Sequence, residues 1–173
     1  MNKYVASVSG LTGANLGFLT LRLWLGSRAL LTGLEKYVGK SVTQEPLLDS
    51  TGQPDISGAT MQVESKVYGF SYYRALPESL RTKFDAEPLL PAFATKTFCA
   101  ILGPSLIVLG LAVLLGLFTR PALFLSGVIY TALTLGLILI GQDQGVAALG
   151  VHIALVAFAL VRAQDNRFTV TRP

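Results

Sequence analysis

The apolar residues of this chain are gathered into four long runs, and this clustering constrains the fold more than any other feature of the sequence. A helix needs roughly 20 mostly apolar residues to span about 30 Å of hydrocarbon. The runs cover residues 14–38, 92–118, 121–140 and 146–162. Apolar residues make up 51% of the 173 residues and charged residues only 14%, which departs from soluble proteins in the direction of lipid. We therefore expect an all-α membrane protein, a single domain (residues 1–173) built as an antiparallel bundle of four transmembrane helices.

The first run differs from the other three because it contains Arg22 and Arg28. A secretory signal peptide has an uninterrupted apolar core, so the two arginines favour a helix that is retained. An amphipathic helix of a soluble bundle would suit this run alone, but the later three runs are nearly free of charge on every face.

Short links join the last three runs and can only connect antiparallel neighbours. Pro121 suits the first helical turn, where its missing donor costs nothing. Gly103 and Pro104 predict a kink in the second helix, as a packing feature or as a hinge. Four spans put both termini on one side, and that side carries most of the basic residues outside the long loop: Lys3, Arg120, Arg162, Arg167 and Arg172. The positive-inside rule therefore places both termini in the cytoplasm.

The segment 39–91 between the first two runs is expected to be extracytoplasmic and too long for a plain connector. Residues 61–73 combine partial alternation with four aromatic side chains, which is typical of a short hairpin or of an interfacial aromatic anchor, and we favour the anchor. Residues 77–87 predict a short helix in which Leu80 and Phe84 share one face, a pattern suited to lying along the membrane surface.

The first run carries two polar stripes at helical spacing. One contains Arg22, Gly26, Gly33 and Lys36, and the other contains Arg28, Thr32 and Glu35. An arginine at mid-depth in lipid costs at least about 2.5 kcal/mol, and glycines allow close helix approach, so both stripes are expected to face protein. The arginines are then either members of an internal ion pair, with Glu35 as a candidate for Arg28, or part of a site for an anionic or carbonyl ligand such as a quinone headgroup.

His152 is the only histidine and lies inside the fourth run. One histidine supplies neither a bis-histidine haem nor a complete metal site. It is either hydrogen-bonded between helices or, with Gln142, Asp143 and Gln144, relays a proton or binds a quinone carbonyl.

Several function classes lack support in the sequence. The net charge of +4 is dispersed without a basic run, which argues against nucleic-acid binding. Cys99 is the only cysteine, so one chain forms no disulfide or Cys-x-x-Cys pair; Cys99 and Trp24 are expected to be structural. No phosphate-binding loop or hydrolase motif is present. Any catalysis would therefore need another subunit or a diffusible cofactor, so whether the chain is an enzyme component stays open.

Two motifs resemble DoxX-like membrane proteins. The first is LRLWLG at residues 21–26 followed by GLEK at 33–36, and the second is Leu109-Gly110 followed by LGLFTRPA at 115–122. The long external segment is similar to the DoxD branch, the small membrane subunit of thiosulfate:quinone oxidoreductase. The glycine-rich ending usual in the family is replaced here by AQDNR at 163–167.

The resemblance implies an accessory or anchoring subunit of an oxidoreductase complex in the bacterial inner membrane, with other membrane or periplasmic subunits as partners. The implied quinone-proximal residues are Arg22, Arg28, Glu35, Lys36 and His152. Gly26, Gly33, Gly116 and Pro121 are expected to serve packing. One alternative is a thiosulfate:quinone oxidoreductase subunit with an anion site among Lys36, Lys40, Arg74 and Arg81; another is a purely structural packing subunit. A transporter fits less well, because four helices leave little room for inverted repeats.

Overall fold

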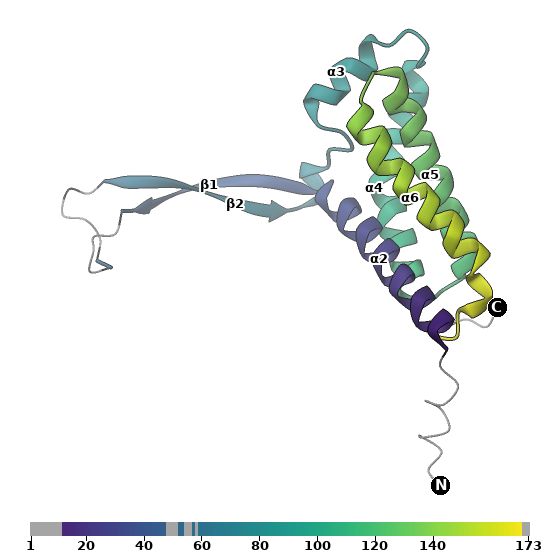
Figure 1. Ribbon diagram of the computed structural model, residues 1–173. Helices are drawn as coiled ribbons and strands as arrows, with labels where there is room; N and C mark the ends of the chain where they lie inside the picture. The colour runs from purple at the N-terminus through teal and green to yellow at the C-terminus, as the bar shows by residue number, and fades with distance from the viewer. Residues whose placement is uncertain (1–11, 48–51, 54–56, 58, 171–173) are drawn as a thin grey trace. The chain divides into compact units, whose positions relative to one another are not determined.

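The computed structural model describes residues 12–47, 52–53, 57 and 59–170, and these residues are mostly helical (Figure 1). The helices are α2 (Gly13–Glu35), α3 (Glu78–Ala86), α4 (Ala92–Leu115), α5 (Thr119–Leu139) and α6 (Asp143–Val161), with 3₁₀ turns η1 (Phe70–Tyr72) and η2 (Ala163–Asp165). The strands are β1 (Val38–Pro46) and β2 (Thr60–Tyr68). The chain divides into a helical unit, Met1–Leu34 with Ala75–Pro173, and a hairpin unit, Glu35–Arg74.

Three helices in the described part of the chain are long and apolar enough to cross a membrane, namely α4, α5 and α6. They confirm the three later apolar runs, with ends that differ from the predicted ones by at most three residues. Large apolar side chains such as Val108, Phe124 and Phe158 are exposed on their outer surfaces. Helices that are apolar on every face are suited to lipid, where exposure of such side chains is favourable.

α2 is as long as these helices but less apolar, and it ends at Glu35 rather than at the predicted residue 38. Its beginning is set by Thr12 and Asn15. The backbone amide of Thr12 donates to Asn15 Oδ1 at 3.0 Å, and the Thr12 hydroxyl bonds the same oxygen at 2.8 Å. In return, the backbone amide of Asn15 donates to Thr12 Oγ1 at 3.4 Å. This reciprocal arrangement resembles a capping box, which satisfies donors that a helix start leaves unpaired. The predicted helix ran too far at its other end because Val38 already begins β1.

Glycines bring α2 and α4 into close antiparallel contact. A Cβ atom added at Gly26 would lie 2.9 Å from the amide nitrogen of Leu114, and one at Gly33 would lie 2.9 Å from that of Ile107. From the other side, a Cβ at Gly110 would lie 2.5 Å from the amide nitrogen of Leu30. Small residues at membrane helix interfaces allow this backbone approach. The glycines therefore hold α2 along α4 within the helical unit.

Left-handed glycines end the helices at both short links. Gly116 follows α4 with a φ of 71°, and the amide of Leu117 then donates to the carbonyl of Ala112 at 2.8 Å. Gly141 follows α5 with a φ of 65°, and the amide of Gln142 donates to the carbonyl of Leu137 at 2.9 Å. This helix ending satisfies carbonyl groups that would otherwise lack donors. It also turns the chain back at once, so that α4 lies against α5 and α5 against α6 (Figure 1).

The predicted short helix at 77–87 is present as α3. Phe84 is buried on it, and a Cβ at Gly136 of α5 would lie 2.9 Å from the Phe84 ring. Beside this contact lies an apolar cavity of about 280 Å³ lined by residues of α3, α4 and α5. Phe84 therefore fastens α3 to α5 through the space that a glycine leaves.

The hairpin unit consists of β1 and β2 paired antiparallel, from Val38 opposite Tyr68 to Pro46 opposite Thr60. At its base the Tyr37 ring contacts the rings of Phe70 and Tyr73 at centroid distances of 5.7 and 4.8 Å. Of the predicted range 61–73, the residues up to Tyr68 form one strand of this hairpin, and the other strand, β1, lies outside that range. The favoured interpretation, an interfacial anchor formed by the aromatic residues, stays a prediction.

Candidate functional site

Arg22 is buried in the helical unit, with 5% of its surface exposed. Its Nη1 donates to Asn166 Oδ1 at 2.8 Å and to the carbonyl of Phe168, and its Nη2 donates to the carbonyl of Leu114 at 3.4 Å. These acceptors are neutral, so the expected internal ion pair is not what holds Arg22. Its Nε is buried without a partner among the described residues. The guanidinium therefore joins α2, the end of α4 and the segment after α6.

Residues around Arg22 add further bonds to this region and connect it to the start of α5. Asn166 Nδ2 donates to the Thr119 hydroxyl at 2.9 Å, and Asn15 Nδ2 donates to the carbonyl of Asp165 at 2.8 Å. A Cβ at Gly116 would lie 2.8 Å from Arg22 Nη1, so glycine is required there for space as well as for its backbone conformation. Pro121 lies in the first turn of α5, as expected. The contacts around Arg22 therefore form a structural network at this end of the helical unit.

Arg28 has a different environment. It lies six residues further along α2, its side chain is exposed, and it forms no ion pair with a described residue. Glu35, its expected partner, is also exposed and unpaired among those residues. The charge of Arg28 does contribute to the electrostatic environment of Tyr130 on α5. The second polar stripe of α2 is thus covered less completely by this chain than the first.

Tyr130 and His152 meet between α5 and α6. Their rings are 5.8 Å apart at 65°, an edge-on contact, and Tyr130 is only 5% exposed. His152 Nδ1 lies 2.8 Å from the carbonyl oxygen of Ala148, while Nε2 is buried without a partner among the described residues. Both residues lie near the midpoints of their helices. We call Arg28, Tyr130 and His152 the polar cluster.

The other predicted site residues lie in other parts of the chain. Asp143 begins α6 nine residues before His152, which is roughly 13 Å along a helix. Glu35, Lys36, Lys40 and Arg74 belong to the hairpin unit, whereas Arg81 belongs to α3. Lys40 is paired with Glu64 at 2.7 Å and Arg81 lies 3.8 Å from Asp85. An anion at either cation would have to compete with a carboxylate already beside it.

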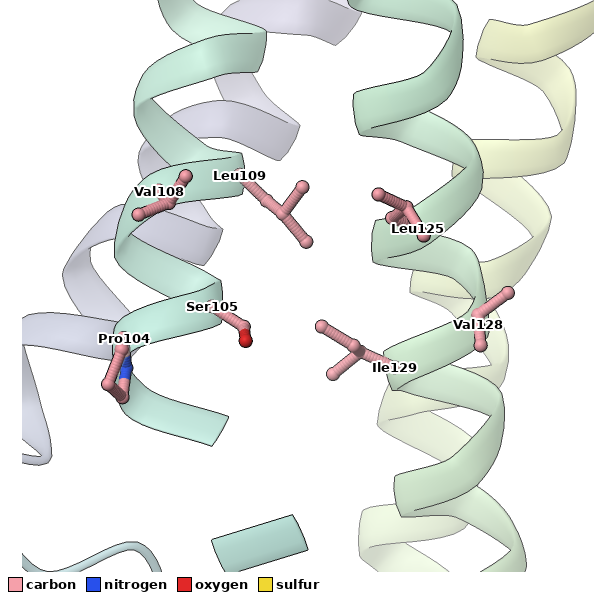
Figure 2. A pocket seen from close by; sticks show the side chains of 7 residues that line it. All are labelled: Pro104, Ser105, Val108, Leu109, Leu125, Val128 and Ile129. Carbon is pink, nitrogen blue, oxygen red and sulfur yellow. The ribbon is translucent and has the colours of Figure 1, made fainter. Parts of the chain in front are cut away.

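The groove between α4 and α5 contains a cavity that is almost entirely apolar. Figure 2 shows side chains of both helices facing a cavity of about 370 Å³. Its lining is apolar apart from Ser105: Pro104, Val108, Leu109, Leu125, Val128 and Ile129. Such a surface suits hydrocarbon, but it lacks the convergent polar groups that orient a headgroup. The polar cluster on α2, α5 and α6 is the better candidate for recognition.

Two functional positions are not apparent from the predicted patterns. Tyr130 stands in an apolar helix, and the need of its phenol for a polar neighbour at mid-depth is the signal that would have found it. Asn166 lies in the segment that departs from the DoxX-like ending, and no local pattern links it to Arg22. In the described residues no group of three or more His, Cys, Asp or Glu side chains could hold a metal ion.

Comparison with known protein families, with curated proteins and with solved structures finds no match to this chain.

Proposed function

We propose that this chain is a protein of the bacterial inner membrane with four spans. α2 crosses the membrane in addition to α4, α5 and α6, and both termini are cytoplasmic. Glycine contacts hold α2 along α4, which is itself apolar enough to span a bilayer. Arg120, Arg162 and Arg167 follow α4 or α6 and so lie at the same end of the antiparallel helices, as the positive-inside rule requires of the cytoplasmic side. Lys3 and Arg172 lie outside the described residues. The segment 39–91 is then extracytoplasmic.

Its function, on this proposal, is that of an accessory or anchoring subunit of a membrane oxidoreductase complex, next to a quinone. The observation that carries this is the polar cluster. Tyr130 and His152 bring a phenol and an imidazole together near the middle of two apolar helices, and Arg28 of α2 adds a cation that acts electrostatically on Tyr130. Ionisable residues inside membrane helices are costly and usually functional.

The cluster suits a quinone for reasons of chemistry and location. A quinone headgroup carries two oxygens that accept hydrogen bonds from donors such as Arg28 and the Tyr130 hydroxyl. Its apolar tail keeps it in the bilayer, where the exposed side of Arg28 would meet it. The resemblance of residues 21–26 and 115–122 to DoxX-like proteins supports the same assignment. The chain supplies binding and orientation, and electron transfer would belong to a partner subunit.

A structural packing subunit is the second candidate, and one observation favours it. Arg28 is exposed within α2, and a charge inside a membrane helix is stabilised when another protein covers it. A thiosulfate:quinone oxidoreductase would further need a periplasmic partner. The hairpin unit is the part that such a partner would contact, since Phe70 is 91% exposed there.

Gentle solubilisation from native membranes tests the proposal. The native complex is separated on a gel, its chains are identified and its quinones are extracted. We expect redox subunits and a quinone to travel with this protein. Arg28→Gln should lose the quinone but keep the partners, whereas Arg120→Gln, a matched change at an exposed arginine in the first turn of α5, should lose neither. If Arg28→Gln instead releases the protein from a complex that keeps its chemistry, the packing role is correct. A protein that runs alone without quinone contradicts both.

A further inference from the structure

The hydrogen bond of His152 to its own helix fixes which ring nitrogen carries the proton. Nδ1 lies 2.8 Å from the carbonyl oxygen of Ala148, one helical turn earlier. A carbonyl oxygen only accepts hydrogen bonds, so Nδ1 must be the donor. In a neutral imidazole one ring nitrogen donates a hydrogen bond and the other accepts one. Nε2 is then a lone-pair acceptor.

This acceptor is buried and has no partner among the described residues. A buried polar atom without a hydrogen bond destabilises the structure unless a ligand or water supplies one. The Tyr130 ring contacts the imidazole edge-on, and Arg28 interacts electrostatically with Tyr130. The cluster therefore combines one acceptor, Nε2, with a guanidinium that can only donate and a phenol that can do either.

The two redox forms of a quinone differ in the bond they can make to Nε2. Carbonyl oxygens of the oxidised form accept hydrogen bonds but donate none, so they leave Nε2 unsatisfied. Each hydroxyl of the reduced form donates one hydrogen bond and still accepts from Arg28 or Tyr130. Only the hydroxyl-bearing form satisfies every member of the cluster.

We propose that His152 accepts a hydrogen bond from the ligand hydroxyl, so that the site binds a quinol in preference to the corresponding quinone. This inference rests on the proposed function, and it adds the redox form of the ligand and the atom that selects it. One additional buried hydrogen bond corresponds to an affinity ratio on the order of tenfold.

The test is equilibrium binding to the purified full-length protein in lipid nanodiscs, under anaerobic conditions, with the redox state of each probe monitored. The probes are a short-tailed benzoquinone, its quinol, and the dimethyl ether of that quinol, which keeps the ring and both oxygens but has a methyl group in place of each donor hydrogen. We expect the quinol to bind about tenfold more tightly than the quinone and the ether. His152→Phe keeps an aromatic ring beside Tyr130 and should reduce quinol affinity to that of the quinone. Gln164→Leu, a change at an exposed residue after α6, should leave the ratio unchanged.

The outcomes separate the inference from the function it rests on. If quinone and quinol bind equally, or if the ether matches the quinol, His152 does not select a hydroxyl, although the headgroup site remains. If none of the three probes binds, the quinone-proximal site itself is wrong. These comparisons use the unmodified protein, so they decide the question even if His152→Phe fails to fold.

Discussion

Arg22, midway along α2, and Asn166, which follows α6, are separated by 144 residues and joined by a hydrogen bond of 2.8 Å. Replacing Asn166 with alanine removes this bond and the bond from Asn166 to Thr119. Because Arg22 is buried and charged, we expect a loss of roughly 1.5–3 kcal/mol in stability. Thermal unfolding in mild detergent measures it, with Gln164→Ala as the exposed neighbouring control. Equal melting temperatures for the two variants would show that the hydrogen bonds of Asn166 contribute nothing to stability.

The α2–α4 contact predicts opposite effects for two glycine-to-alanine changes. In Gly110→Ala the new methyl group would lie 2.5 Å from the amide nitrogen of Leu30, so the helices must separate. Overpacking of this kind costs about 1–3 kcal/mol. A Cβ at Gly150 of α6 meets no atom within 4 Å, and alanine favours helix by about 1 kcal/mol over glycine. Size-exclusion profiles and melting temperatures should therefore worsen for Gly110→Ala and hold or improve for Gly150→Ala; the reverse order would refute the close contact.

Alanine substitutions at two glycines with positive φ separate the cost of backbone strain from the cost of steric overlap. Gly116→Ala and Gly141→Ala both place alanine at a positive φ, which costs about 1–2 kcal/mol. Only at Gly116 does the added Cβ also meet Arg22 Nη1 and the carbonyl oxygen of Phe168, both at 2.8 Å, whereas Gly141 has open space. We expect Gly116→Ala to be clearly the more destabilising in detergent melts. Similar losses of stability at both positions would mean that the Arg22 side chain moves away from the added methyl group at little energetic cost.

Phe84 should control how firmly α3 is held. Phe84→Ala removes the ring that packs against Gly136, and burying such a ring is worth about 3–5 kcal/mol in a packed core. Arg81 and Lys83 of α3 should then be cleaved faster by trypsin in limited proteolysis. Leu89→Ala, at a side chain that is 73% exposed, is the control. Unchanged cleavage in Phe84→Ala would show that other contacts fasten α3.

The three apolar helices could be predicted from sequence because lipid replaces water around them. α4, α5 and α6 are apolar on nearly every face, so composition alone marks their extent. β1 could not be predicted in the same way. Most of its residues from Val42 onward are exposed, so the strand has no alternation between a buried and a solvent face for the sequence to display.

The candidate site was predicted only in part, for a geometrical reason. The first helix was expected to present Arg22 and Arg28 to protein, yet the two have different surroundings. Which helix contacts which arginine depends on the rotation and register of the packed helices, and the sequence of one helix determines neither of them. The Tyr130–His152 contact likewise depends on how α5 and α6 align after the turn at Gly141.

The network around Arg22 also bears on how the protein is made. Asn166 is translated 144 residues after Arg22, and until then the guanidinium lacks two of its acceptors, Asn166 Oδ1 and the carbonyl of Phe168. Burying a charged group without such acceptors is costly. The segment after α6 therefore completes the structure around Arg22, and the helical unit reaches its full stability only once that segment has been made.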